Sequence, residues 1–171
     1  MNGIAETKFQ GPVLDAAEKA LATGAACHIL VWVPAGTENM VKNLLEKACC
    51  ERTISLTGEC RAADGYFRTV LRLHSAHCGL RNLNYATRTP QEREIIRTVE
   101  SACRSGDYQE IGAVLGIYKD TGVRERFCEV LERRDYPAGD IAAGRRYTTA
   151  FVDLVALVIS RCSGSRDQVP A

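Results

Sequence analysis

The sequence has almost no excess charge and no long apolar run. Its 22 basic and 21 acidic side chains leave a formal net charge of +1, whereas nucleic acids and anionic membrane surfaces select a concentrated basic face. The longest apolar stretch, residues 150–160, has 11 residues and is interrupted by Asp153, and a membrane span needs about 20 residues. We therefore expect no nucleic-acid partner and no membrane partner.

Signatures of established chemistry are also absent. The sequence has no Cys-x-x-Cys pair, Gly-rich phosphate loop, nucleophilic Ser elbow or His-Glu-x-x-His motif. Because these motifs are absent, we predict no cofactor. Its 8 cysteines are too sparse for a disulfide scaffold, and residues 1–10 lack the apolar run of a secretory signal. These features are typical of a cytoplasmic protein with reduced cysteines that act as small hydrophobic side chains.

What the sequence does contain is helical periodicity. Apolar residues recur three and four positions apart along most of the chain, which predicts an all-α fold. The expected helices are 12–22, 25–33, 38–51, 58–76, 90–104, 107–118, 122–133 and 140–161. Residues 27–33 are rich in β-branched and aromatic side chains, so a short buried strand stays open there as an alternative.

Local signals mark several helix ends. Residues 89–92 read Thr-Pro-Gln-Glu, the pattern of a capping box with proline at the first helical position. Asp107 gives a weaker start signal of the same kind. Gly24 and Gly106 stand where a left-handed residue would end a helix.

The helical pattern repeats along the chain. The apolar spacing of residues 13–33 recurs 82 positions later in residues 95–115, with a glycine at the same place in both. We therefore predict one domain, residues 1–171, made of two tandem pseudo-symmetric helical repeats of about 80 residues, with halves at about 12–78 and 90–162. Ligand pockets favour the cleft that such halves form between them.

Motifs of moderate specificity are spread over nearly the whole chain. They are Gly-Pro-Val at 11–13, Ala-Leu-Ala-Thr-Gly at 20–24, Ile-Leu-Val-Trp-Val at 29–33, the segment 67–79 around His74, and Arg-Arg-Tyr at 145–147. Together they make the sequence similar to an uncharacterised bacterial and archaeal family of unknown function. The resemblance implies a shared fold and no known activity.

The chain departs from that family's pattern in two places. The family's His-Cys-Asp-Thr leader falls on Ala-Glu-Thr-Lys at 5–8, and the acidic residue of its Ala-Gly-Glu-Gly stretch is replaced near His77 and Cys78. Only His74 is kept. If the family uses the leader on a metal or a substrate, this chain has lost or changed that function.

His74 is the first candidate for chemistry. It lies on the apolar stripe of the helix expected at 58–76, and its partner in the second repeat is Leu154, a core position. A histidine at such a position is either a hydrogen-bonded core residue or an acid–base group that works near neutral pH. Both interpretations stay open.

A metal site is the alternative use of the same region. His74 and Cys78 are four residues apart, so they share one face of a helix, and His77 lies next to them. The competing interpretation is a solvated His77, a buried Cys78 and a His74 bonded to a main-chain carbonyl.

The last helix supplies the remaining candidates. Tyr147 is the predicted hydrogen-bond donor to a substrate, and Arg145 and Arg146 form a predicted anion clamp. Trp32, which lies in the first half of the chain, is the third predicted substrate-binding residue beside the two arginines. A core tyrosine and solvated arginines are the structural alternatives.

These residues give one leading hypothesis and two alternatives. The leading one is a small-molecule ligand in the cleft and cofactor-independent acid–base chemistry of the isomerase, cyclase or lyase type, with His74 and Tyr147 as catalytic residues. The alternatives are a non-catalytic helical protein-interaction module and a metal-binding protein that uses His74, His77 and Cys78. Formation of a homo-oligomer stays open.

Overall fold

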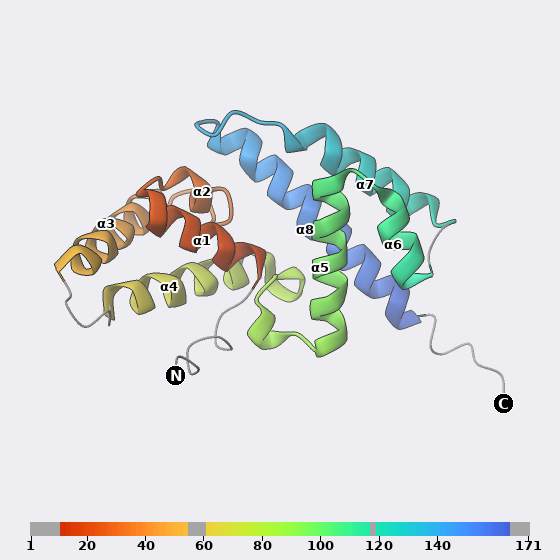
Figure 1. Ribbon diagram of the computed structural model, residues 1–171, viewed down its shortest axis with the longest axis horizontal. Helices are drawn as coiled ribbons and strands as arrows, with labels where there is room; N and C mark the ends of the chain where they lie inside the picture. Colours follow the sequence, from red (N-terminus) through yellow and green to blue (C-terminus); the bar gives the residue numbers. More distant parts are fainter. Residues whose placement is uncertain (1–10, 55–60, 117–118, 165–171) are drawn as a thin grey trace. The chain divides into compact units, whose positions relative to one another are not determined.

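The computed structural model describes residues 11–54, 61–116 and 119–164, and every regular element in these ranges is a helix. The elements are α1 (Pro12–Thr23), α2 (Cys27–Leu30), α3 (Glu38–Ile54), α4 (Arg61–Cys78), η1 (Gly79–Arg81), η2 (Tyr85–Thr87), α5 (Pro90–Ser105), α6 (Tyr108–Leu115), α7 (Thr121–Arg134) and α8 (Ile141–Gly164) (Figure 1). The all-α prediction is confirmed. The segment 5–8, on which the family's leader falls, lies outside the described residues.

The helix expected at 25–33 is much shorter than predicted. α2 is a single turn, Cys27–Leu30, and the chain continues in a turn in which the Trp32 N–H donates to the Ile29 carbonyl at 3.0 Å. Pro34 limits the helix, because it has no N–H to donate to the Leu30 carbonyl four residues earlier and it disfavours the helical conformation of Val33. The strand alternative is wrong, since the structure shows helix and turn here.

The predicted helix ends are confirmed in position, but the weaker capping box expected from Asp107 and Glu110 does not form, because the Glu110 carboxylate accepts from the Ser105 hydroxyl at 2.6 Å. The Thr89 side chain accepts a hydrogen bond from the Glu92 N–H at 3.2 Å, and the Glu92 carboxylate accepts one from the Thr89 N–H at 2.8 Å, which together form a complete capping box. The Asp107 carboxylate caps α6 by accepting from the Gln109 N–H at 2.8 Å. α1 and α5 each end on a left-handed glycine, Gly24 and Gly106.

The chain divides into two compact units. The first runs to Ala86 and also includes Ala138–Ala142, and the second comprises Thr87–Pro137 and the residues from Ala143 onward. The division after Ala86 falls inside the segment that joins the two predicted halves. The repeat and its pseudo-symmetry remain predictions, and each unit is described by itself below.

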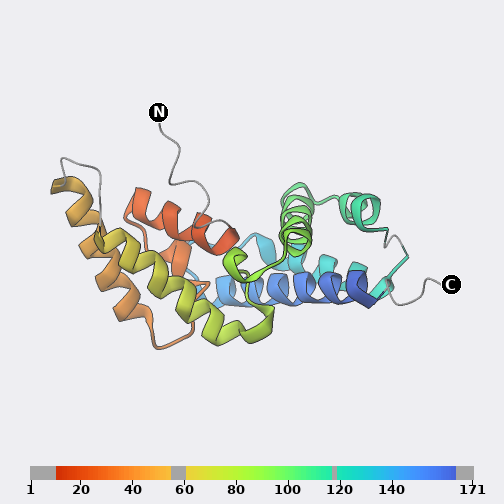
Figure 2. The same ribbon diagram turned by 90° about the horizontal axis from the view of Figure 1, so that it is seen from below.

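In the first unit, α3 and α4 lie side by side and α1 packs against α2 and α4 (Figures 1 and 2). The Tyr66 hydroxyl of α4 donates to the Ala17 carbonyl of α1 at 3.3 Å, so the two helices are also joined by a buried hydrogen bond. The buried hydrophobic residues from α1 to α4 are Val13, Leu14, Ala17, Ala20, Ile29, Leu30, Val31, Val33, Val41, Leu45, Ala48, Ala63, Tyr66, Val70 and Leu71.

In the second unit, α5 packs against α6 and α7. The helices α7 and α8 run in opposite directions (Figure 1). The antiparallel pair is tied at one end, where Arg161 of α8 lies 2.9 Å from the carboxylate of Asp120, the N-cap of α7. The buried hydrophobic residues of this unit are Ile95, Ile96, Val99, Ala102, Cys103, Ile111, Val123, Phe127, Val130, Ala150, Phe151, Val152, Leu154, Val155 and Val158.

The segment between α4 and α5 is more ordered than the sequence predicts. It forms two 3-10 turns, η1 and η2, and asparagine side chains fold it: the Asn82 side chain accepts from the Asn84 N–H and the Asn84 side chain accepts from the Ala86 N–H, both at 3.1 Å. Leu83 and Tyr85 are buried. The segment is therefore packed onto the first unit and is not a free linker.

Candidate functional site

His74 lies on the buried face of α4. The helical spacing of Ala63, Tyr66, Val70 and Leu71 places their side chains on the same face, and His74 is only 1% exposed. A polar ring that water cannot reach must find its hydrogen-bond partners within the protein.

Both ring nitrogens of His74 bind main-chain groups. The Leu83 N–H donates to Nε2 at 3.1 Å, so Nε2 carries a lone pair and no proton. The neutral ring then has its proton on Nδ1, which donates to the Trp32 carbonyl oxygen at 3.0 Å. A single tautomer therefore satisfies both partners and joins α4 to the turn after α2 and to the segment after η1.

The surroundings keep His74 neutral. Burial lowers the pKa of the ring below its ordinary value of 6.5, the Trp32 carbonyl raises this pKa, and the nearby His77 lowers it. Because both nitrogens are already bonded to the main chain, neither is open to a ligand. The geometry favours a hydrogen-bonded core histidine over an acid–base group.

The metal hypothesis gains no support from this region. The Cys78 thiol lies 3.8 Å from Nδ1 of His74, but His77 is exposed, and Nδ1 is already engaged by the Trp32 carbonyl. Within 11–54, 61–116 and 119–164, no three His, Cys, Asp or Glu side chains gather closely enough to hold a metal ion. The seven cysteines in these ranges are free thiols, and Cys60 lies outside the described residues.

Trp32 is brought next to His74. Its ring lies edge-on to the imidazole, with the ring centroids 5.9 Å apart and an interplanar angle of 67°. The side chain is half-buried, so one part of it packs on the core and another part reaches the surface. This contact accounts for the position of Trp32 without a substrate, and its predicted contact with substrate remains a prediction.

Tyr147 lies in the second unit among aromatic rings. Its ring centroid is 5.7 Å from that of Tyr136 and 6.3 Å from that of Phe151. Burial raises the pKa of the hydroxyl to about 12, and the neighbouring Cys103, Tyr136 and Glu100 add to the increase while Arg134 opposes it. Tyr147 is thus a neutral hydrogen-bond donor at physiological pH, as the predicted role requires.

The two arginines before Tyr147 differ in exposure. Arg145 is half-buried and its carbonyl accepts from the Thr148 hydroxyl at 3.2 Å, whereas Arg146 is exposed. Both belong to the second unit, as Tyr147 does, and His74 and Trp32 belong to the first. The structure therefore groups the predicted residues within units, and their meeting in a cleft remains a prediction.

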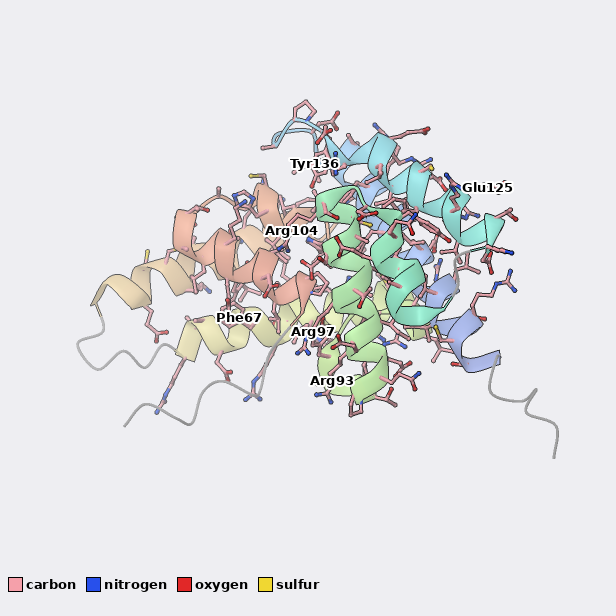
Figure 3. The ribbon with its side chains drawn as sticks, turned by 45° about the vertical axis from the view of Figure 1, so that its right-hand side comes forward. Phe67, Arg93, Arg97, Arg104, Glu125 and Tyr136 are labelled. Atoms are coloured by element: carbon pink, nitrogen blue, oxygen red, sulfur yellow. The ribbon has the colours of Figure 1, made fainter. Side chains whose placement is uncertain are left out.

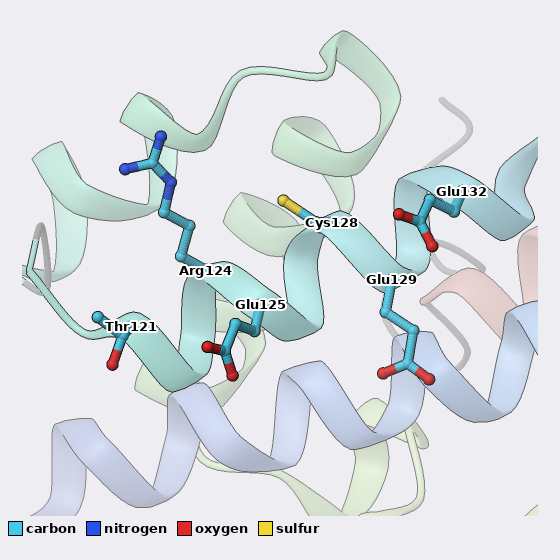
Figure 4. A pocket seen from close by; sticks show the side chains of 6 residues that line it. All are labelled: Thr121, Arg124, Glu125, Cys128, Glu129 and Glu132. Atoms are coloured by element: carbon cyan, nitrogen blue, oxygen red, sulfur yellow. The ribbon is translucent and has the colours of Figure 1, made fainter.

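The second unit has a surface hollow that the sequence did not indicate. It has a volume of about 400 Å³ and lies along α7 (Figure 4). We call its lining residues the α7 face: Thr121, Arg124, Glu125, Cys128, Glu129 and Glu132. In Figure 4, Arg124 and Cys128 project to one side of the helix, and Glu125 and Glu129 project to the other.

The charges of the α7 face are unevenly paired. Glu129 lies 2.8 Å from both Arg126 and Arg133. Glu125 and Glu132 have no hydrogen bond or ion pair within the described residues, although the charge of Glu125 helps to raise the pKa of the neighbouring Arg126. Each of the other described carboxylates of the second unit interacts with a partner. Figure 3 shows Glu125 on α7 and Tyr136 in the segment that follows this helix.

Two further hollows of similar volume lie along α3 in the first unit. One hollow, of about 430 Å³, is lined by Asn43, Glu46, Lys47 and Cys50. The other, of about 390 Å³, is lined by Gly24, Ala26, Lys42, Leu45, Glu46 and Cys49. Both mix acidic and basic side chains, so neither selects a ligand by charge.

The described residues define an all-helical protein. A family model described as a family of unknown function (DUF6448) matches residues 10–157, and the chain belongs to that family. No curated protein and no solved structure matches the chain. Of the helices in the described ranges, none is both long and apolar enough to cross a membrane.

Proposed function

We propose that the chain is a non-catalytic helical module that binds another protein through the α7 face. The observation that carries this proposal is the pair of unpaired carboxylates, Glu125 and Glu132, on a hollowed and exposed helix face. A surface that is already paired with its own arginines offers a partner little electrostatic gain, whereas two unpaired carboxylates can each accept a cation.

The state of His74 supports this choice over acid–base chemistry. His74 has the side-chain chemistry for proton transfer near neutral pH, but it is only 1% exposed. Both of its ring nitrogens are hydrogen-bonded to the main chain. The hollows described above are open surface features on α3 and α7.

The charge on the α7 face specifies the chemistry of the partner. It holds three carboxylates and one guanidinium, and the Arg124 guanidinium lies over the Tyr108 ring, 6.0 Å from its centroid. Glu125 and Glu132 are seven residues apart, which is about two helical turns or about 10 Å along α7. The fitting partner is a protein segment that presents two Lys or Arg side chains at this separation.

Site-specific photo-crosslinking tests the location of this surface. A photo-reactive amino acid at position 128 is expected to capture one protein in the cells that make this chain, through a segment rich in Lys or Arg. The same amino acid at position 97, which is exposed on α5, is the matched control and should not capture it. Equal capture from both positions would contradict the proposal.

Binding of the purified partner then tests the role of charge. In the double variant Glu125→Arg/Glu132→Arg we expect the dissociation constant to rise about tenfold or more, most steeply at low salt, because attraction is replaced by repulsion. Glu94→Arg, a change to an exposed carboxylate on α5, is the control and should leave the constant unchanged. An unchanged constant in the double variant would refute the assignment of the α7 face.

A further inference from the structure

The segment Gly79–Tyr85 is anchored to the first unit at three points. The side chains of Leu83 and Tyr85 are 1% and 5% exposed, and the Leu83 N–H donates to Nε2 of His74. Gly11 lies directly against the Tyr85 ring, since a Cβ atom on Gly11 would be 2.8 Å from Cδ1 of that ring. The anchored segment in turn carries Leu80, which is 94% exposed.

We propose that His74 is a proton-operated latch, which holds the segment Gly79–Tyr85 on α4 when its ring is neutral and releases it when the ring is protonated. The proposal rests on the geometry at Nε2. It is independent of the proposed protein partner.

The chemistry of the step is a single protonation from solvent. The proton binds the lone pair of Nε2, and the new N–H then points at the Leu83 N–H. In the neutral state the two nitrogen atoms are 3.1 Å apart. Two donors cannot share this position, so the Leu83 amide must move away or stay buried without a partner. The Nδ1–H bond to the Trp32 carbonyl is kept in the cation, so the ring stays anchored on that side and the loss falls on the Gly79–Tyr85 segment.

Among the described residues, groups from three parts of the first unit face His74. On α4 they are His77, whose charge opposes protonation, and the Cys78 thiol, 3.8 Å from Nδ1. The turn after α2 contributes the carbonyl and the indole of Trp32, and the segment after η1 contributes the Leu83 amide. None of these three groups gains or loses a proton near neutral pH. Burial is the largest influence on the pKa of the ring and lowers it. Opening of the segment exposes the ring to water and removes this effect, so the open state binds the proton more readily than the closed state.

Release changes the surface that the first unit presents. The buried side chains of Leu83 and Tyr85 become accessible beside Leu80, and the contact of Tyr85 with Gly11 at the start of α1 is lost. The latch therefore converts acidification into exposure of apolar surface at one defined place.

Hydrogen exchange followed by NMR on the full chain tests the latch. If the opened ring titrates at its ordinary value of 6.5, the opening equilibrium should rise about tenfold between about pH 7.5 and about pH 5.5. We expect this loss of protection at the Leu83 amide, after correction for the intrinsic exchange rate. We also expect Leu83 to stay less protected than the Val70 amide inside α4 at each pH, because release of the segment does not require the first unit to unfold. In His77→Gln, which changes the exposed neighbour, the loss should persist.

The variant His74→Gln separates the latch from a structural role. A glutamine retains an acceptor that can reach the Leu83 N–H but does not titrate, so the loss of Leu83 protection with acid should disappear. Persistence of the loss in this variant would overturn the proposal. Equal protection of Leu83 and Val70 in the parent chain would also overturn it, because Leu83 would then exchange only when the whole unit unfolds, and so would the absence of a loss at Leu83. If the glutamine variant does not fold, the comparison of Leu83 with Val70 in the parent chain decides the matter.

Discussion

The main-chain N–H of Leu83 donates to Nε2 of His74 at 3.1 Å, and this bond fixes the tautomer of the only buried histidine among the described residues. Because Nε2 is the acceptor, the proton lies on Nδ1, and the Trp32 carbonyl receives it. One side chain thus holds two main-chain segments that are 42 and 9 residues away from it in sequence.

Replacing His74 with alanine should destabilise the first unit strongly. The Trp32 carbonyl and the Leu83 amide lose their partners and a cavity is left, so we expect a loss of about 3 kcal/mol or more in the free energy of unfolding. Chemical denaturation followed by the fluorescence of Trp32, the single tryptophan, measures it. His77→Ala, at an exposed site, should change it by less than about 0.5 kcal/mol, and equal stability of the two variants would contradict the core role.

The stability of the first unit should fall as the pH is lowered below 6.5. The pKa of His74 is lower in the folded state than its ordinary 6.5, so between these two values the unfolded chain binds more protons than the folded chain. The stabilisation is fully present above pH 6.5 and is lost as the pH falls towards the folded pKa, by on the order of 1 kcal/mol per pH unit. Unfolding monitored at several pH values measures this slope, which should flatten in His74→Gln; an identical slope in that variant would refute the explanation.

Two glycines of the first unit should respond in opposite directions to alanine. Gly11 has a φ of +119° and its Cβ position is 2.8 Å from the Tyr85 ring, so Gly11→Ala should cost about 1–3 kcal/mol. Gly65 lies within α4 with nothing near its Cβ position, so Gly65→Ala should stabilise the helix by about 0.5–1 kcal/mol. The midpoints of thermal unfolding report both signs, and a stabilising Gly11→Ala would show that the packing of Gly11 on Tyr85 is not as described.

The cysteines should divide into reactive and inert groups. Cys103 is buried, and burial raises the pKa of its thiol to about 12, so almost no thiolate is present at neutral pH. Cys50 and Cys128 are exposed. Iodoacetamide at neutral pH should therefore modify the exposed pair and spare Cys103 until the chain is denatured. Peptide mass spectrometry measures the extents, and modification of Cys103 at the rate of Cys50 would contradict the burial of α5 in its unit.

The helices and their ends were predictable because their signals are local. The apolar spacing of α4 and the capping box of Thr89 and Glu92 each lie within a few residues of the structure that they determine. The shortness of α2 was missed because its apolar run continues through Val33, and the effect of Pro34 on the preceding residue outweighs that run.

The candidate site was predictable only in part. The position of His74 on an apolar stripe indicated a buried ring, but its partners are main-chain groups of Trp32 and Leu83, and main-chain groups leave no signature in a sequence. The alternating apolar residues Leu83 and Tyr85, within a segment interpreted as a joint, were the available signal. The α7 face was missed because a charged helix face is usually solvated, and only the geometry shows that Glu125 and Glu132 lack partners.

The tautomer of His74 is the most direct test of the account, and the nitrogen chemical shifts of its imidazole measure it in the labelled full chain at neutral pH. We predict a neutral ring with the proton on Nδ1 and an unprotonated Nε2 that is coupled to the Leu83 amide. A ring protonated on Nε2, or a cationic ring, would contradict the hydrogen bonds on which the core role of His74 and the latch depend.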